Sequence, residues 1–333
     1  MSRRLIITLS CILASILVGV LVAVVAVTGN TSDSSPLTGD LAAHDPALVA
    51  GASGQPWYVF STGSEAGPGT IEIRRSSDGH DWSQVGNVGT KIPAWVSERV
   101  PGVKNLWAPE LVHHGKLWYL YYAASTFGSN NSVIGLMTNT TLDPSSPSSR
   151  WVDRGAVTGS VPTDDFNAID PGIVEDAHGT PWMTFGSFWS GIRQVRLSWP
   201  SGLRADPAAV PLRLVDRKTP PNAVEAATTV RHGGWYYLFV SFDFCCRALN
   251  STYNIDVGRS RSVSGPYRDE SGRPLLAGGG TKILGTDGRQ IGPGGASASR
   301  GYLAYHFYDG DAGGATTLGI RKIAWGADGW PKL

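Results

Sequence analysis

A short phrase recurs five times along this chain, and each copy precedes an aromatic-rich apolar run. The copies begin at Asp45, Ala108, Asp170, Glu225 and Gly292, and the runs cover residues 57–60, 118–121, 182–185, 235–238 and 302–305. The starts are roughly 63, 62, 55 and 67 residues apart, somewhat longer than typical blade repeats of propellers. A unit of this size buries its apolar face only against its neighbours, so the spacing predicts an array of similar units.

The runs within each unit have the length and composition of β-strands. Short alternating or apolar segments lie between clusters of Gly, Pro, Asn, Asp and Ser, and from residue 41 onward no segment has a sustained helical period. Each unit fits an inner strand, an aromatic strand, an alternating strand and an outer strand. The pattern predicts an all-β, five-bladed β-propeller, a single domain over residues 41–333. A ring also avoids the limit of roughly 250–300 residues on one hydrophobic core.

The first 29 residues have the features of an export segment. Arg3 and Arg4 precede an apolar stretch over residues 5–27, which is long enough to span a membrane and longer than the roughly 7–15 residues of a usual signal peptide. The arginines favour a cytoplasmic N-terminus. We expect a signal peptide or signal-anchor helix over residues 1–29 and a flexible linker over residues 30–40. The domain would then be extracellular, either secreted or anchored to the outer face of the membrane.

Composition and motifs exclude several functional classes. The formal net charge is +1, so nothing favours nucleic acid as a partner, and the membrane would be contacted only through the N-terminal segment. The sequence has no zinc or calcium motif and no phosphate-binding glycine loop, so we expect chemistry without a cofactor. We expect a monomer. Two adjacent cysteines, Cys245 and Cys246, either form a disulfide between neighbours or remain two buried thiols.

Acidic residues open three of the five copies, namely Asp45, Asp170 and Glu225. A closed ring would bring matching positions together at one central mouth. Glycoside hydrolysis needs two carboxyl groups in different protonation states, and a third negative charge can raise the pKa of the proton donor. The alternative is that Asp-Pro only opens a turn before a strand, but Glu225 has no proline after it. Glu110 is offset by two positions, and we interpret it as a supporting or structural acid.

Aromatic and histidine side chains flank these acids. Trp107, Phe188 and Trp189 fall in loops beside the inner strands, where an aromatic face can stack on a sugar or fill space between blades. His44 precedes Asp45, and His306 lies in the last aromatic run; each fits either a structural role or a contact in the mouth.

Several stretches in one order resemble the arabinanases of glycoside hydrolase family 43. They are His44-Asp45-Pro46, Leu106-Trp107-Ala108-Pro109-Glu110, Asn167-Ala168-Ile169-Asp170-Pro171-Gly172, Gly186-Ser187-Phe188-Trp189-Ser190-Gly191-Ile192, Asn222-Ala223-Val224-Glu225-Ala226 and residues 241–246, 251–255 and 257–260. The resemblance implies a five-bladed propeller that acts on α-1,5-linked L-arabinan or arabino-oligosaccharides with inversion at the anomeric carbon.

Roles follow from the resemblance, residue by residue. Asp45 would be the general base, Glu225 the general acid, and Asp170 the group that orients the acid and tunes its pKa. Substrate contacts are implied for a further set, namely Trp107, Asn167, Ser187, Phe188 and Trp189.

One position departs from the family pattern. Relatives commonly carry a histidine after Gly-Pro-Gly in the fifth copy, where it helps hold calcium or another ion on the propeller axis, whereas this chain has Gly295. An axial ion would therefore be absent, held by water, or reached by another histidine such as His306.

The sequence thus predicts an exported, inverting endo-1,5-α-L-arabinanase. Two alternatives stay open. An exo-acting α-L-arabinofuranosidase or β-xylosidase would use the same scaffold and chemistry, because loop shape decides between internal and terminal cleavage. A membrane-tethered sugar-binding propeller without catalysis is the alternative from another class.

Overall fold

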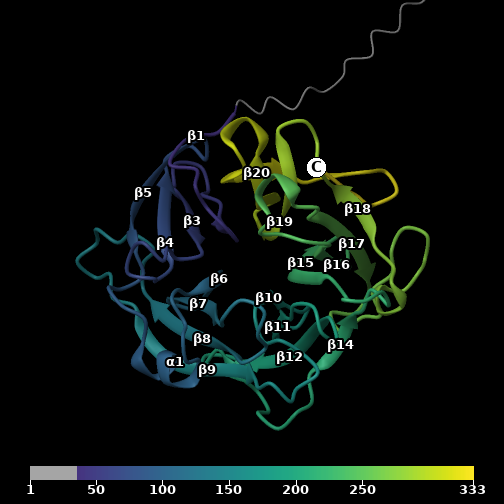
Figure 1. Cartoon of the computed structure of the whole chain (residues 1–333), viewed down its shortest axis with the longest axis horizontal. Helices are drawn as coiled ribbons and strands as arrows, with labels where there is room; N and C mark the ends of the chain where they lie inside the picture. The colour runs from purple at the N-terminus through teal and green to yellow at the C-terminus, as the bar shows by residue number, and fades with distance from the viewer. Residues whose placement is uncertain (1–35) are drawn as a thin grey trace, which may run out of the picture. The chain divides into compact units, whose positions relative to one another are not determined.

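Five antiparallel sheets are arranged around a central axis, as Figure 1 shows for the computed structural model. The structure describes residues 36–333, so the export segment predicted for residues 1–29 and the start of the expected linker lie outside the described residues. Within the described part, no helix is both long and apolar enough to cross a membrane. The strands nearest the axis contact one another in cyclic order, which closes the ring. They are β2 (Ala47–Val49), β6 (Trp107–His114), β10 (Gly172–Glu175), β15 (Val224–His232) and β19 (Gln290–Ser299).

Each blade is built from strands that follow one another along the chain. The blades are β2 (Ala47–Val49), β3 (Trp57–Ser61), β4 (Glu72–Ser76) and β5 (Asp81–Asn87); β6 (Trp107–His114), β7 (Leu117–Ala124), β8 (Ser132–Asn139) and β9 (Val152–Ser160); β10 (Gly172–Glu175), β11 (Pro181–Phe185), β12 (Ile192–Ser198), β13 (Leu203–Arg204) and β14 (Leu212–Val215); β15 (Val224–His232), β16 (Trp235–Phe242), β17 (Asn254–Ser260) and β18 (Thr281–Leu284); and β19 (Gln290–Ser299), β20 (Tyr302–Asp309) and β21 (Ala315–Lys322). The all-β, five-bladed propeller predicted from the repeats is confirmed.

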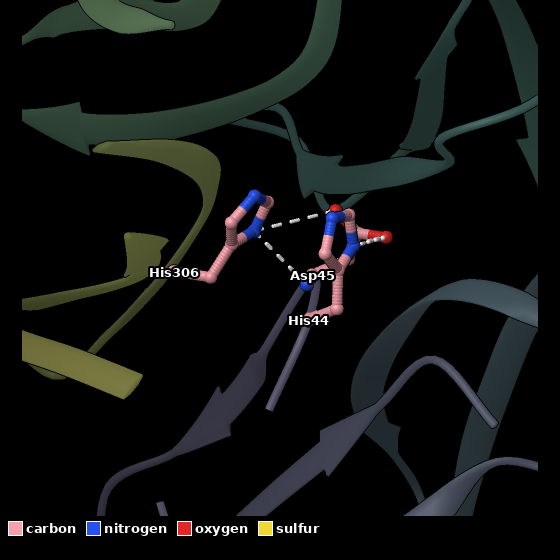
Figure 2. Close-up of side chains that lie close together, drawn as sticks. All are labelled: His44, Asp45 and His306. Carbon is pink, nitrogen blue, oxygen red and sulfur yellow. Dashed lines mark hydrogen bonds and ion pairs between the residues drawn. The ribbon is translucent and has the colours of Figure 1, made fainter. Parts of the chain in front are cut away.

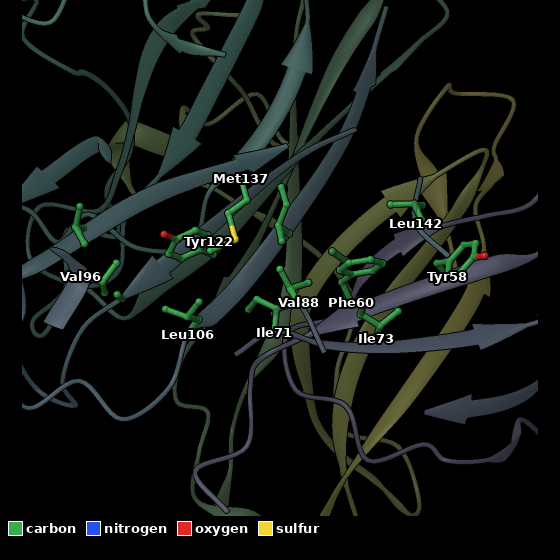
Figure 3. Packing of buried hydrophobic residues seen from close by; sticks show 14 of the residues in the cluster. Tyr58, Phe60, Ile71, Ile73, Val88, Val96, Leu106, Tyr122, Met137 and Leu142 are labelled. Carbon is green, nitrogen blue, oxygen red and sulfur yellow. The ribbon is translucent and has the colours of Figure 1, made fainter. Parts of the chain in front are cut away.

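The aromatic runs form the second strand of each blade and supply the core between blades. Phe60, Tyr121, Phe185, Phe239 and Tyr305, one from each run or its edge, are at most 1% exposed. Figure 3 shows one such layer, in which side chains of the first and second blades pack together. Burial of one such side chain contributes about 2–3 kcal/mol, so the ring is held by five apolar seams rather than by one central core.

The structure differs from the sequence prediction at the two ends of the ring. The described part of the fifth blade has three strands instead of four, and its outermost strand is joined by the N-terminal segment, where Leu318 N–H donates to the carbonyl of Leu41 at 2.8 Å. Strand β1 (Thr38–Gly39) pairs with β5 in parallel, although these residues were expected in the linker. Hydrogen bonds that the linker composition does not indicate hold it there, including Thr38 Oγ1 to Asp81 at 2.8 Å.

Short helical segments lie outside the blades, where no helix was expected. They are α1 (Ala94–Arg99), η1 (Ala248–Asn250), η2 (Leu275–Ala277) and η3 (Gly310–Ala312). A further hairpin, β22 (Ala324–Trp325) with β23 (Pro331–Lys332), follows the fifth blade.

Each inner strand is entered through a residue with left-handed backbone. The φ angles are +48° at Asp45, +41° at Ala108, +58° at Asp170, +52° at Ala226 and +62° at Gly295. The pairing register shifts close to this residue in β6, β15 and β19, as expected for a β-bulge. Bulges of this kind redirect the neighbouring side chains.

The position of the bulge in β15 shows which residue of the fourth copy is equivalent to Asp45 and Asp170. The residue equivalent to Asp45 and Asp170 is Ala226, and Glu225 precedes it by one position. Glu225 therefore matches His44 of the first blade and Trp107 of the second. The expectation that the three acids occupy one repeat position is wrong by one residue for Glu225, because the sequence does not reveal where the bulge lies.

Candidate active site

Asp45 and Asp170 line one cavity on the propeller axis, together with Glu110, Ala226 and Gly295. Its water-accessible space is about 30 Å³. One water needs roughly 10–15 Å³ by a comparable measure, so the cavity can take water but not a pentose ring. The axial cavity therefore has room for solvent alone.

Glu225 is held by two neutral hydroxyl groups. Ser187 Oγ donates to Oε2 at 2.6 Å, and the Tyr253 hydroxyl donates to Oε1 at 2.9 Å. The side chain is 8% exposed. Burial raises the pKa of Glu225 and the charge of Asp45 adds to this, while the two hydroxyl donors lower it, with a net upward shift. Glu225 can thus hold a proton above the usual range of a carboxylic acid.

Asp170 lies beside Glu225. Its Oδ2 accepts a hydrogen bond at 3.1 Å from the backbone N–H of Ala226, the residue after Glu225. Burial raises the pKa of Asp170 well above its usual value, and the negative charges of Glu225 and Asp45 raise it further. Because neighbouring carboxylates resist simultaneous ionisation, the Asp170–Glu225 pair retains a proton to higher pH than either group alone would.

Asp45 has a different environment. Its Oδ2 lies 2.7 Å from His44 Nδ1 and accepts from Thr62 Oγ1 at 2.8 Å. Burial would raise the pKa of Asp45, but the charge and hydrogen bond of His44 outweigh it and hold the pKa well below its usual range. Asp45 is thus ionised, and its Oδ1 is the oxygen that neither donor occupies.

The histidines beside Asp45 form the one cluster in residues 36–333 with metal-ligand spacing, namely His44, Asp45 and His306 (Figure 2). Nδ1 of each histidine is already engaged, whereas Nε2 of His306 is buried without a hydrogen-bond partner in the described residues. Nδ1 of His306 accepts the backbone N–H of Asp45 at 3.2 Å, so its ring proton lies on Nε2, and Nδ1 of His44 is bonded to Asp45. Burial lowers the pKa of His306 to about 3, so the ring is neutral. With both Nδ1 atoms engaged and a proton on Nε2 of His306, this donor set does not fit an ion.

Gly295 and His306 share a space. A Cβ atom at Gly295 would lie 2.7 Å from His306 Nδ1 and 2.8 Å from Asp45 Oδ1, and the φ angle of Gly295 is +62°. A side chain at residue 295 would therefore crowd both the histidine ring and the free oxygen of Asp45.

The predicted sugar contacts differ in their accessibility. Trp189 is 40% exposed, Phe188 and Trp107 are half-buried, and Trp107 Nε1 donates to Asn105 at 2.9 Å. Asn167 is 4% exposed, and its Oδ1 accepts from a neighbouring serine at 2.6 Å. The three aromatic side chains are thus open to a ligand, whereas Asn167 and Ser187 have internal hydrogen bonds.

Glu110 is buried at the axial cavity, and one long hydrogen bond offsets little of the cost of burying its carboxyl group. Its Oε1 lies 3.5 Å from the N–H of Ile173, and burial raises its pKa to about 8. Glu110 is therefore mostly neutral near pH 7, in keeping with the supporting role interpreted from its offset.

Sequence reasoning missed the partners that distinguish the acids. Thr62, Tyr253 and Tyr308 contact the site from strand ends and loops that show no repeated signature. Tyr253 lies in residues 251–255, one of the stretches that carry the family resemblance, so the resemblance could have pointed to it. Cys245 and Cys246 form a disulfide, and Cys246 is exposed, so the alternative of two buried thiols is wrong.

A five-bladed propeller with two carboxyl groups at its mouth, one with a raised and one with a lowered pKa, fits a glycoside hydrolase of the two-carboxyl class. The family model "Glycosyl hydrolases family 43" matches residues 38–331, and the chain belongs to that family.

Relatives and solved structures agree with this assignment. An extracellular exo-α-(1→5)-L-arabinofuranosidase of Cellvibrio japonicus is 38% identical over 87% of this chain and 86% of that protein. An extracellular endo-α-(1→5)-L-arabinanase of Bacillus subtilis is 38% identical over 86% of each chain. The solved endo-arabinanase of Bacillus licheniformis has a TM-score of 0.83 and 37% identity, over 90% of this chain and 99% of that structure.

Proposed function

We propose that this family 43 hydrolase is an exported endo-1,5-α-L-arabinanase that inverts the anomeric carbon. The observation that carries the proposal is the contrast between two carboxyl groups at one mouth. Glu225 is bonded to neutral hydroxyls and has a raised pKa, while Asp45 is paired with His44 and has a lowered pKa. Such a pair is ready to donate and to accept a proton at the same pH.

The proposed reaction is a single displacement. Glu225 gives its proton to the departing O5 as the bond from that oxygen to the anomeric carbon breaks. Oδ1 of Asp45 takes a proton from a water molecule, whose oxygen bonds to the anomeric carbon from the opposite face. Asp170 orients the acid through Ala226 and keeps a proton on the pair. Solvent then returns the proton to Glu225 and removes the one on Asp45.

The proposed substrate is linear α-1,5-L-arabinan, with Trp107, Phe188 and Trp189 as sugar contacts. Similarity to an endo-arabinanase over most of both chains supports the substrate. Export is supported by the arginine-led apolar segment and by two relatives named as extracellular. We propose no cofactor for the chemistry.

A second candidate is exo-acting cleavage by the same groups. It is favoured by the relative from Cellvibrio japonicus, which is named an exo-acting enzyme and is as similar to this chain as the endo-acting one. Retention of both carboxyl groups with opposite pKa shifts argues against a sugar-binding propeller without catalysis.

Product analysis on linear arabinan tests the proposal. We expect mixed oligosaccharides early in the reaction, and proton NMR of the first products should show the inverted anomer. Arabinose alone at early times would support the exo-acting candidate. Binding without any new reducing ends over a day would overturn the assignment of catalysis.

A further inference from the structure

The disulfide lies in the turn between β16 and β17, at the mouth of the propeller. We call residues 244–247, which contain Cys245 and Cys246, the disulfide turn. A bond between sequence neighbours closes almost no loop, so it removes little entropy from the unfolded chain and stabilises the fold little by that route. Its effect must be local, on the shape of the turn and on what the turn contacts.

The disulfide turn contacts the candidate base through two side chains. The backbone N–H of Cys246 donates to the Tyr308 hydroxyl at 2.7 Å, and that hydroxyl lies 3.3 Å from His44 Nε2. Sγ of Cys246 is 3.7 Å from the same nitrogen. The other nitrogen of His44, Nδ1, lies 2.7 Å from Oδ2 of Asp45. An unbroken series of polar contacts thus runs from the turn to Asp45.

The direction of these contacts fixes the orientation of His44. An ionised Asp45 can only accept, so Nδ1 of His44 must carry a proton. Burial raises the pKa of Tyr308 to about 12, so its hydroxyl stays protonated. The hydroxyl oxygen accepts the N–H of Cys246, and the same group lies within hydrogen-bond distance of Nε2 of His44. The ring of His44 also stacks on His306 with centroids 3.8 Å apart. His44 is therefore confined on its face and at both nitrogens.

The same turn also reaches the acid side of the mouth. The ring of Phe244 lies 5.9 Å from that of Phe188, which follows the serine bonded to Glu225. Arg247 stacks over Phe244 at 4.0 Å. A change in the shape of the turn would therefore alter contacts next to both Asp45 and Glu225.

We propose that the disulfide turn is a positioning element for the general base: through Tyr308 it holds His44, and His44 fixes Oδ2 of Asp45 so that Oδ1 faces the attacking water. This inference rests on the proposed function of Asp45. Because the turn acts through other residues and not on the sugar's reacting atoms, its loss should lower kcat more than it raises KM.

The kinetic test compares three variants with the wild type on linear arabinan. We expect the double variant Cys245→Ala/Cys246→Ala to lower kcat about tenfold with KM within about twofold, and Tyr308→Phe to do the same. The matched control is Tyr305→Phe, on the same strand, whose hydroxyl contacts Gln290 and Arg321 instead; its kcat should stay at the wild-type value.

Two further experiments separate a positioning role from a general structural effect: one combines the cysteine variant with Tyr308→Phe, and the other reduces the disulfide. Because the turn and Tyr308 act in one series, the combined cysteine and Tyr308→Phe variant should lose no more than about tenfold, instead of about a hundredfold. A phosphine reductant should lower kcat of the wild type and leave the cysteine-free variant unchanged. Additive losses, or a kcat of the cysteine-free variant within twofold of wild type, would overturn the proposal.

A readout without hydrolysis keeps this inference distinct from the proposed function. The proton on His44 Nδ1, assigned by its loss in His44→Gln, should be visible by NMR in the oxidised wild type and should exchange faster in Tyr308→Phe and in the cysteine-free variant. Equal exchange in all three proteins would refute the positioning role, even if the wild type cleaves arabinan. The expected difference would support the role even if arabinan is not the substrate.

Discussion

Glu225 and Asp45 flank the same mouth, but opposite kinds of donor hold them. Glu225 accepts from the hydroxyls of Ser187 and Tyr253, which carry no charge, whereas Asp45 is bonded to the imidazole of His44. A neutral donor leaves a buried carboxyl free to keep its proton, while a cationic donor favours the carboxylate. Two chemically similar groups thus acquire opposite pKa shifts from their neighbours, and the following predictions test the acid and base roles proposed for them.

Removing either carboxyl should have the largest effect. Glu225→Gln and Asp45→Asn keep the size of the side chain but abolish proton donation or acceptance, so each should lower kcat on linear arabinan by at least about a hundredfold. Reducing-sugar assays measure the loss, and circular dichroism checks the fold. Near-normal turnover in either variant would end the assignment of that residue.

Asp170→Asn should lower the pKa of Glu225, the proposed proton donor. Asp170 and Glu225 form an interacting pair that resists losing its last proton, so with Asp170 replaced by a neutral amide Glu225 should lose its proton more readily. The basic limb of the kcat profile should then move to lower pH. We expect kcat at the optimum to fall about tenfold, equivalent to about 1.4 kcal/mol of transition-state stabilisation. A basic limb that stays in place would show that Asp170 does not tune the acid.

Two milder variants should move opposite limbs of the pH profile. Tyr253→Phe removes a donor that lowers the pKa of Glu225, so the basic limb should move to higher pH. His44→Gln removes the charge that lowers the pKa of Asp45, so the acidic limb should also move to higher pH. Changes at the optimum should be about threefold to tenfold. An acidic limb that stays in place in His44→Gln, or a basic limb that stays in place in Tyr253→Phe, would contradict the assigned roles.

Chelation should have the smallest effect. Nδ1 of His306 accepts the N–H of Asp45, so the ring proton lies on Nε2 and neither nitrogen of His306 offers a lone pair to an axial ion. Incubation with EDTA followed by assay on linear arabinan should change kcat by less than about twofold. A larger loss, restored by calcium, would show that an ion contributes to the site.

The ring and the positions of Asp45 and Asp170 were predictable because each blade repeats one phrase and must bury it against its neighbours. Glu225 was found as a candidate but aligned one residue off, because a β-bulge is a backbone feature without a fixed residue type. Tyr308 and the disulfide turn could not be assigned, since they approach His44 from a strand and a loop far away in sequence. Within residues 36–333 the fifth blade also lacks the expected fourth strand, and the segment at Leu41 pairs with its outer strand instead.

The ring closes between the first and fifth blades, and Asp45 lies on that junction. The backbone N–H groups of Asp45, Leu48 and Ala50 donate across it to His306, Ser297 and Ser299, at 3.2, 3.1 and 3.1 Å. The proposed base, Asp45, is therefore held in place by the fifth blade, which the chain forms last in sequence. A chain shortened before residue 297 would keep Glu225 but lose the three contacts that position Asp45.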